Sequence, residues 1–545
     1  MCGIQVLRRS TPVCCALVPG ASCSVCFVRP QHLLFLAQPT MMSAVGWLFE
    51  ATCSMFYLKS PSHLALDDSD PPPRFLLEHG IPMFFIMIMV EAGVSAVLRA
   101  WRSRQGTMHA LGVSFTPRYR LNDFVACATL GSLQRVFQLL VELLDVTVHV
   151  GGYRFVYDHF RLFTIAPKSN VLLSYICLML GKDLAYYWAH RFMHEFHVVW
   201  LTHSVHHSGQ DYNLATGLRQ GVFQPFFTWL FYLPLALLGF HPAAFSAHAQ
   251  LNTLYMYWIH TDLVNRLPWP LEYILNTPMA HRMHHRPPGN CNYAGMFIVW
   301  DRLFGTYVAE VDRKDYYGLA HAPQTFDAVV LNCQHAQRMA QSHAVRLCQQ
   351  RRAAATANAC KAADSPPGPS TVAAAMAAQA PRASWHWGWV LRRRVPARWV
   401  CDWHLLFHPI PPPGRDLRRA KNARLWDGET SLCGWRGAGV LLCMGGTLVG
   451  AVVLLVRAAR MHRADAVLAT AVTCASLVLI NRACDQRKVD GQAPLAACAL
   501  LVLLLSALLS LQPCAQLGLG RVGDSHMHAD AHGNDTSLPA AAGAM

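Results

Sequence analysis

Three short clusters of histidine are the residues of this sequence best suited to chemistry. Most of the histidines within a cluster lie three or four positions apart, which places their imidazoles on one helical face, about 5 to 6 Å apart at Cβ. Imidazoles gathered in this way suit a shared metal site. The clusters read HRFMH (His190, His194), HSVHH (His203, His206, His207) and HRMHH (His281, His284, His285).

The number of clustered histidines bears on the kind of metal centre. A lone histidine is more often an ordinary surface residue than a ligand, and 28 histidines in 545 residues supply some pairs by chance. Chance does not supply three clusters in this order, each at or just beyond the end of an apolar segment, so we predict that all eight bind metal. Imidazole suits Zn, Cu, Fe and Ni. Eight ligands exceed a three-histidine zinc site, so a dinuclear iron centre fits best.

Other polar residues near the clusters are weaker candidates. His260 lies 21 residues before the third cluster and is either a ninth ligand or an interfacial residue of an aromatic belt. Asp183 lies two helical turns before His190 and either hydrogen-bonds a ligand imidazole or makes a polar contact between helices. We expect His197 and His248 to be structural.

The elements that must position these residues are apolar. Only 14% of the residues are charged, against roughly 25% in an ordinary soluble domain, and 53% are hydrophobic. The composition and the long apolar runs predict an all-α, polytopic integral membrane protein with seven or eight membrane-associated helices. The expected segments are Ile81–Leu98, Asp123–Val150, Val171–Ala189, Phe223–Phe240, Pro242–Ile259, Gly437–Val456, Ala464–Ile480 and Ala493–Leu511.

The net charge of +15 raises the question of nucleic acid binding. The basic stretches near Arg102, from Leu391 and from Arg415 instead lie between or beside apolar segments, where basic residues mark cytoplasmic loops and anionic lipid head groups. We therefore expect a lipid bilayer and no nucleic acid as partner. No convincing span separates the clusters from the basic stretch 321–432, so we expect a metal site that faces the cytosol.

Composition also divides the chain. We expect a poorly specified lead at residues 1–75, a membrane catalytic domain at 76–325, a basic, Ala/Pro-rich linker at 326–432, a C-terminal transmembrane bundle at 433–515 and a disordered tail at 516–545. Within the linker, residues 353–384 are the part that we expect to be disordered. The 19 cysteines are scattered and often lie inside apolar segments, so we expect small buried side chains rather than disulfides.

The clusters and their flanks resemble the fatty acid hydroxylase superfamily of membrane di-iron enzymes. The closest resemblance within it is to the alkylglycerol monooxygenases, because DYNLATGLRQ follows the second cluster directly. The match covers much of residues 180–325, whereas the lead, the linker and the C-terminal bundle match poorly. The segments that carry it are KDLAYYWAHRFMHEFHVVW, THSVHHSGQDYNLATGLRQ, LYMYWIHTDLVNRL, LNTPMAHRMHH and NYAGMFIVWDRLFGTYVAE.

This resemblance implies a function. The eight cluster histidines occupy the ligand positions of the family, for two irons per chain. Glu195, beside His194, occupies an acidic position linked to tetrahydrobiopterin binding, although it could equally hydrogen-bond a neighbouring imidazole. The implied reaction uses O₂ and tetrahydrobiopterin to hydroxylate the ether-linked carbon of an alkylglycerol lipid, and the resulting hemiacetal collapses to a fatty aldehyde and a glycerol derivative. The implied location is the endoplasmic reticulum membrane.

Other functions stay open at this point. The chain has no GxGxxG fingerprint and no cysteine set spaced for an iron–sulfur cluster, so electrons must come from outside. The nearest alternative is a sterol or fatty acid hydroxylase or desaturase supplied by a cytochrome and its reductase. A non-catalytic membrane scaffold and a proton or metal transporter are further alternatives. The oligomeric state is left open.

Overall fold

The structure is a computed structural model, and the regular secondary structure in the residues that it describes is helical. These are residues 44–105, 117–144, 149–287, 289–310, 317–319, 323–362, 434–458, 461–484 and 493–510. No strand occurs among them, which confirms the all-α prediction. The first 43 residues, most of the expected linker and the expected C-terminal tail lie outside the described residues.

Four helical segments are long and apolar enough to cross a membrane. They are Leu76–Trp101, Leu121–Leu143, Gly437–Arg457 and Arg463–Cys484. The first combines the π-helix η2 (Leu76–Gly80) with α3 (Ile81–Gln105), and the others correspond to α4 (Leu121–Leu143), α17 (Gly434–Arg457) and α18 (Arg463–Cys484). A multi-pass membrane protein is thereby supported, and four of the seven or eight expected membrane-associated helices are long and apolar enough to be candidate spans among the described residues.

The remaining apolar segments fall short of a span for different reasons. Residues 223–240 break into α8 (Pro225–Thr228), the 3₁₀-helix η6 (Trp229–Tyr232) and α9 (Leu233–Leu237), because prolines start two of these helices. α10 (Pro242–Trp258) has 17 residues and is therefore roughly 26 Å long, short of the hydrocarbon core. α6 (Val171–Glu195) is longer but buries Lys182 and Asp183 at its middle. α19 (Ala493–Ser510) is apolar but short.

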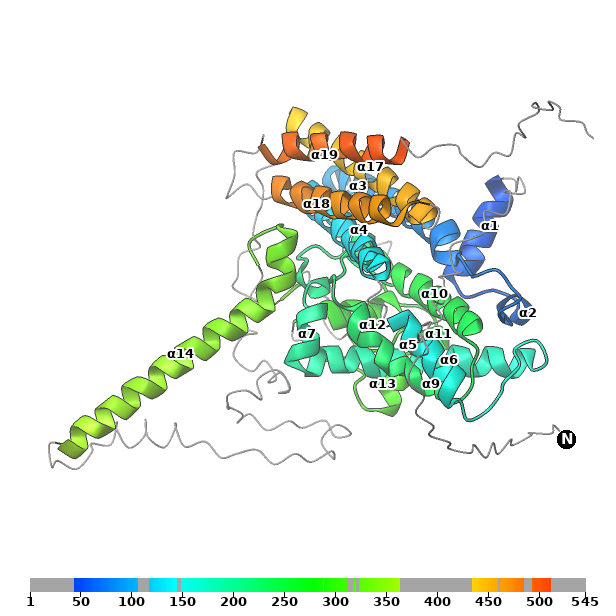
Figure 1. Cartoon of the computed structure of the whole chain (residues 1–545), viewed down its shortest axis with the longest axis horizontal. Coiled ribbons are helices and arrows are strands. Elements are labelled where there is room, and N and C mark those ends of the chain that lie inside the picture. Colours follow the sequence, from blue (N-terminus) through cyan, green and yellow to red (C-terminus); the bar gives the residue numbers. More distant parts are fainter. Residues whose placement is uncertain are drawn as a thin grey trace, which may run out of the picture.

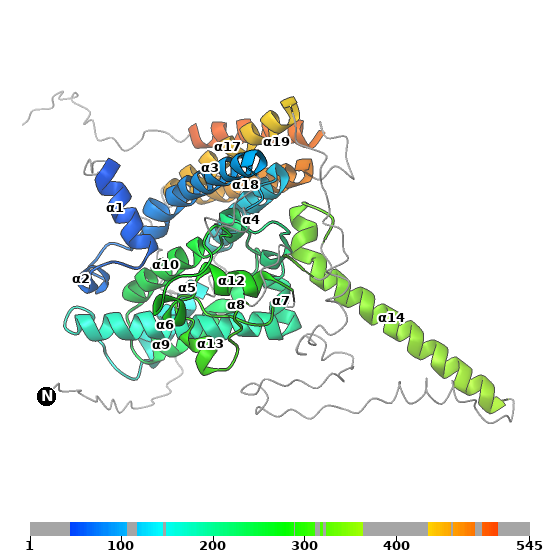
Figure 2. The same cartoon turned by 180° about the vertical axis from the view of Figure 1, so that it is seen from behind.

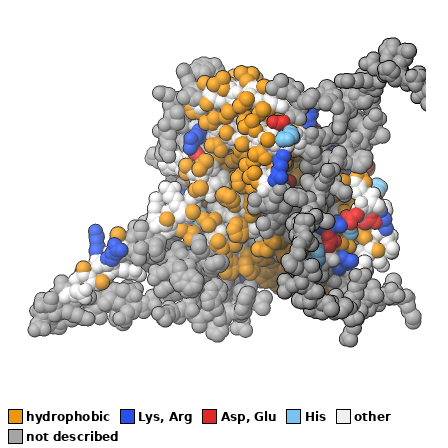
Figure 3. Space-filling view, viewed as in Figure 1, with side chains coloured by type: hydrophobic (Ala, Val, Ile, Leu, Met, Phe, Trp, Pro, Cys, Tyr) orange, Lys and Arg blue, Asp and Glu red, His pale blue; other side chains and the backbone are white. Residues whose placement is uncertain are grey.

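Helix α4 separates two parts of the molecule (Figure 1). On one side it packs against α18 and α17, and α19 packs against both of these helices. On the other side it packs against the 3₁₀-helix η5 (Leu214–Leu218), which belongs to the histidine-bearing part. Hydrophobic side chains dominate the exposed surface over the C-terminal helices in Figure 3, as expected of a lipid-facing bundle; they include Leu442, Val449, Leu500 and Leu503.

The histidine-bearing part is built from shorter helices around α6 and α10 (Figure 2). Helix α10 packs on α6. The N-terminal helix α1 (Ala44–Met55) contacts α10, and α2 (Pro61–Leu64) contacts both α6 and α10. The other elements are α5 (His149–Phe160), α7 (His197–His203), the 3₁₀-helix η4 (His206–Ser208), α11 (Leu271–Ile274), α12 (Pro278–His285) and α13 (Val299–Leu303).

The expected linker begins as a helix. Helix α14 (Ala328–Ala362) has 35 residues, contacts α7 and α18 at its beginning and then extends away from the rest of the molecule (Figure 1). Residues 353–362, which we expected to be disordered, are therefore helical, consistent with the high helix propensity of their alanines. The rest of the expected linker lies outside the described residues. The ten cysteines whose side chains are described form no disulfide with one another; three of them are buried, five are half-buried and two are exposed, so the expectation of small buried side chains holds only for some of them.

Candidate metal centre

Short helices present the histidine clusters to one another. The last turns of α6 carry His190 and His194, and α7 ends at His203. The second cluster continues into η4, and α12 carries the whole third cluster. Thr277 caps α12 by accepting a hydrogen bond from the amide of Ala280 at 3.4 Å, and Pro278 occupies its first turn, so the sequence itself fixes where this helix starts.

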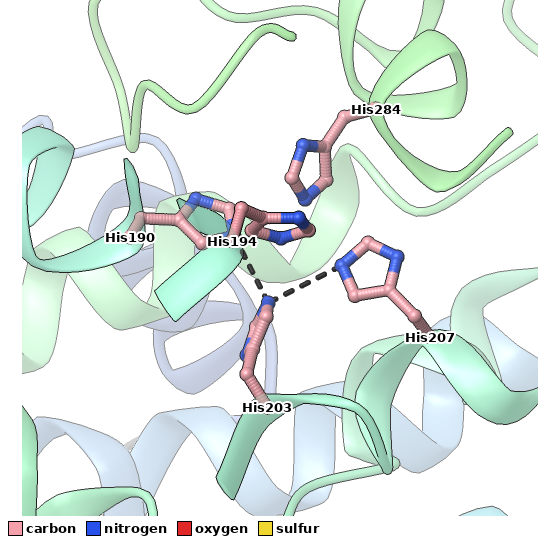
Figure 4. A group of neighbouring side chains, drawn as sticks. All are labelled: His190, His194, His203, His207 and His284. Carbon is pink, nitrogen blue, oxygen red and sulfur yellow. Dashed lines mark hydrogen bonds between the residues drawn. The ribbon is translucent and has the colours of Figure 1, made fainter. Parts of the chain in front are cut away.

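The nine candidate histidines form two groups. In each group, one nitrogen from every imidazole lies within 4.8 Å of the others. Figure 4 shows the side chains of the first group converging from several elements on one space. The first group is His190, His194, His203, His207 and His284, and the second is His206, His260, His281 and His285.

The Nε2 atoms make the closest approaches within each group. In the first, Nε2 of His203 lies 3.0 Å from Nε2 of His190 and 3.2 Å from that of His207. In the second, Nε2 of His281 lies 2.9 Å from that of His260 and 3.2 Å from that of His285. Lone pairs of several neutral imidazoles thus converge on two small volumes, which is the arrangement a metal ion requires.

The opposite ring nitrogens are held by backbone carbonyls. Nδ1 of His190 lies 2.8 Å from the carbonyl oxygen of Tyr293, and Nδ1 of His284 lies 2.8 Å from that of Cys291. Nδ1 of His206 lies 2.9 Å from the carbonyl oxygen of Arg219, and His260 has the same type of contact with Met256. A carbonyl only accepts, so Nδ1 carries the proton and Nε2 keeps its lone pair free for a metal.

Burial keeps these imidazoles neutral. Each of the nine is at most 5% exposed. Burial lowers the pKa of all of them, to about 4 for His206 and about 3 for His260. Nε2 of His194 and of His284 are buried without a hydrogen-bond partner. Because unpartnered buried polar atoms are costly, these two atoms are the clearest sign that the residues fit a metal ion.

Comparisons with known proteins bear on the same residues. Residues 175–306 match the family model Fatty acid hydroxylase. The matched region holds all nine histidines of the two groups and ends just before the last residues of the resemblance seen in the sequence. No solved structure matches the chain significantly.

The most similar curated proteins include three alkylglycerol monooxygenases. The protein of Danio rerio is 38% identical over 276 residues, which is 50% of this chain and 56% of the relative. The Homo sapiens protein is 36% identical over 284 residues and the Xenopus tropicalis protein 37% over 284, each covering 52% of this chain and 58% of the relative. The chain thus spans little more than half the length of these relatives, and the predicted resemblance is confirmed.

His260 lies in the second group, an arrangement compatible with the first of its two interpretations, a ninth ligand. It ends the turn after α10, and its Nε2 lies 3.2 Å from Nε2 of His206, 54 positions earlier in the chain. The second group therefore includes a residue that lies outside all three clusters. His197 and His248 lie outside both groups: His197 contacts His335 at 3.0 Å, and His248 contacts Tyr57.

Asp183 has a different role from the one expected first. Its carboxylate accepts hydrogen bonds from the amides of Met296 and Phe297 at 2.6 and 2.9 Å, the indole of Trp300 at 2.9 Å and the amide group of Asn252 at 2.8 Å. These bonds are contacts between elements and none is with a cluster histidine, which agrees with the second interpretation of Asp183, a polar contact between helices. They anchor the segment that follows Tyr293.

Glu195 lies at the end of α6. One carboxylate oxygen accepts from Nε of Arg191 at 2.8 Å, whereas Oε2 is buried without a hydrogen-bond partner. Burial raises the pKa of this carboxyl, and the nearby guanidinium opposes the shift. Oε2 is therefore a buried acceptor that a ligand with N–H groups would satisfy.

Some residues of the site carry no signal in the histidine pattern. Gln224 presents Oε1 to Nδ1 of His203 at 3.2 Å. Arg219, whose carbonyl holds His206, is itself fully buried and donates to Asp123 of α4 at 3.2 Å and to Ser208 at 2.9 Å. The only available hint was the DYNLATGLRQ element, which contains Arg219 but says nothing of its partner in α4.

Proposed function

We propose that this protein is a membrane di-iron monooxygenase that hydroxylates the ether-linked carbon of alkylglycerol lipids, using O₂ and tetrahydrobiopterin. The observation that carries the proposal is the convergence of nine buried, neutral imidazoles in two groups. The alkylglycerol monooxygenases among the relatives, together with the match to the fatty acid hydroxylase family, support the substrate class.

The two groups would each hold one iron. The first offers five imidazoles and the second four, and the free Nε2 atoms of His194 and His284 fit a metal in the first. Iron bound there would supply the activation of O₂. Neutral ligands suit this setting, since a site with many carboxylates would be far more costly to bury.

The protein's own task would be to orient the rings and to exclude water. The carbonyls of Tyr293, Cys291 and Arg219 fix the tautomers of their imidazole partners, so the ligand set is organised before metal binds. Burial of the site would protect the reacting carbon and oxidant from solvent. Hydroxylation of that carbon gives a hemiacetal, which breaks into a fatty aldehyde and a glycerol derivative.

Glu195 is the proposed contact for tetrahydrobiopterin. Support comes from its buried, unpartnered Oε2, one residue from His194. A pterin offers N–H donors that such an oxygen can accept. Arg191 would hold the other carboxylate oxygen and so set the orientation of the group.

The site would face the cytosol from the endoplasmic reticulum membrane. Between α4 and α17 none of the described residues forms a candidate span, so the histidines and the start of the basic stretch can share one side. The density of arginine in that stretch supports the cytosolic side. A cytosol-facing site would meet soluble pterin and membrane lipid together.

A cofactor comparison tests the proposal. Purified protein in lipid is supplied with an alkylglycerol and O₂, together with either tetrahydrobiopterin or NADPH and a microsomal reductase, and the fatty aldehyde is measured. We expect turnover with tetrahydrobiopterin and about two irons per chain by metal analysis. Turnover only with the reductase would favour a sterol or fatty acid hydroxylase, and zinc without iron would favour a transporter.

A further inference from the structure

A pocket lies between the first candidate span and the histidine groups. Its volume is about 240 Å³, and its walls are almost wholly apolar. Helix α3 supplies one wall, and η5 and the residues that follow α10 supply the others. The residues that carry the argument are Ile86, Val90, Glu91, Leu214, Trp258 and Thr261.

The mouth of the pocket opens on the surface that α3 presents to lipid. Ile86 and Val90 are 42% and 59% exposed, and their neighbour Met89 is 70% exposed on the same candidate span. Outward-facing side chains of a membrane span contact hydrocarbon. With α3 in a bilayer, the mouth of the pocket would therefore open toward the hydrocarbon interior, where alkyl chains are the surrounding medium.

The inner wall adjoins the second histidine group. Thr261 directly follows His260, whose Nε2 lies 2.9 Å from that of His281. Val264, which also lines the pocket, accepts a hydrogen bond on its carbonyl from Arg282 of the third cluster at 2.8 Å. The inner end of the pocket is thus formed by the segment 260–264, which carries His260 and is hydrogen-bonded to Arg282 of the third cluster.

Glu91 fixes this inner wall. It is 2% exposed, and its carboxylate accepts from the amide of Leu214 at 2.8 Å and from the hydroxyls of Tyr119 and Thr261. Among the residues that the structure describes, it is the one charged side chain that lines the pocket. An ionisable side chain within a membrane span is costly and usually functional. Here it ties α3 to both η5 and the residue after His260, which gives the apolar pocket a rigid polar end.

We propose that this pocket takes the alkyl chain of the lipid substrate, with the polar end directed toward the second histidine group and the chain leaving into the bilayer beside α3. The inference rests on the proposed function for the identity of the head group. Its physical basis is the match between apolar walls, an opening into hydrocarbon and a polar inner end next to His260.

A pair of adjacent variants tests the pocket by kinetics. Val90→Trp places a large ring in the mouth, whereas Met89→Trp places the same ring on the lipid-facing surface outside it. With full-length protein in lipid nanodiscs, Val90→Trp should raise KM for an alkylglycerol about ten-fold. Met89→Trp should keep the wild-type KM, and both variants should keep the bound iron. Ile86→Trp repeats the test if Val90→Trp fails to insert.

Photolabelling tests the same pocket without turnover. An alkylglycerol with a diazirine in its chain should label peptides containing Ile86, Val90 or Trp258, and unlabelled alkylglycerol should compete. Competed labelling in a wild-type protein that does not turn over alkylglycerols would support the pocket and overturn the proposed function. Wild-type turnover together with labelling elsewhere, labelling that is not competed, or an unchanged KM in both Trp variants would overturn the pocket alone.

Discussion

The histidine-bearing part and the C-terminal bundle bury different kinds of side chain. The first buries eleven imidazoles, nine of them in the two groups, together with several carboxylates and guanidinium groups, among short helices of mostly 3 to 12 residues. The second consists of the 18- to 24-residue helices α17, α18 and α19, which bury chiefly small and apolar side chains against α4.

This difference teaches what holds each part together. In the bundle, long apolar helices satisfy their own backbone groups and need few side-chain hydrogen bonds. In the histidine part, the short segments leave many backbone groups free, and these groups become partners of Asp183 and the imidazoles. Removing a buried polar side chain should therefore lower the free energy of unfolding much more in the histidine part than in the bundle.

The largest expected effect comes from removing one imidazole. His284→Ala takes a ligand from the five-histidine group and should lower bound iron and abolish turnover, while membrane insertion stays unchanged. Metal analysis and an aldehyde assay measure the two effects. His197→Ala, which removes a histidine outside both groups, is the control and should do much less. Wild-type turnover in His284→Ala would refute the ligand assignment.

Asp183→Asn should give the next largest effect. Asparagine keeps the shape of the side chain, but its NH₂ group would face N–H donors that now donate to the carboxylate. Because two donors cannot pair with each other, the free energy of unfolding should fall by about 3 kcal/mol. Iron retention should fall with it, because the anchored segment follows Tyr293. Thermal denaturation measures the change. Asp158→Asn, in an exposed ion pair with Arg154, should cost at most about 1 kcal/mol, and equal losses would contradict the distinction.

Gly131→Ala tests the seam between the two parts. A Cβ at this position of α4 would lie 2.2 Å from the carbonyl oxygen of Leu218 in η5, and the backbone there has no room to yield. We expect a loss of about 2 kcal/mol in the free energy of unfolding. Gly93→Ala in α3 meets nothing within 4 Å and should not destabilise the protein, since alanine forms helices better than glycine. If Gly131→Ala and Gly93→Ala had the same melting temperature, the close contact between Gly131 of α4 and Leu218 of η5 would be contradicted.

The smallest effect should come from the bundle. Asn481 of α18 donates to the hydroxyl of Thr129 in α4 at 2.6 Å and to the carbonyl of Leu477 at 3.0 Å. Asn481→Leu should cost about 0.6 kcal/mol, as is typical of hydrogen bonds between membrane helices. Turnover and iron content should remain at their wild-type values. A loss of iron in this variant would show that the bundle shapes the metal centre.

The sequence predicted the helical class, four candidate spans and the gathering of the cluster histidines, for identifiable reasons. Charge-free apolar runs such as Gly437–Val456 have few other structures available to them, and histidines at spacings of four share a helical face. The spans between 171 and 259 were overcounted because apolar side chains fill a protein core and a bilayer equally well. The sequence left two interpretations of Asp183 open because two helical turns bring a residue near His190 without deciding which way its carboxylate points.

By itself, the sequence determined which histidines act together at close range. His190 with His194, His203 with His207, and His281 with His285 are pairs four residues apart, and each pair stays within one group. Only the tertiary structure decided the rest. His206 lies in the second group although its neighbour His207 lies in the first, and His284 lies in the first group although His285 lies in the second. Adjacent helical residues point about 100° apart, so their partners depend on which helices pack against each side. That packing also brought in His260, which no local pattern could place.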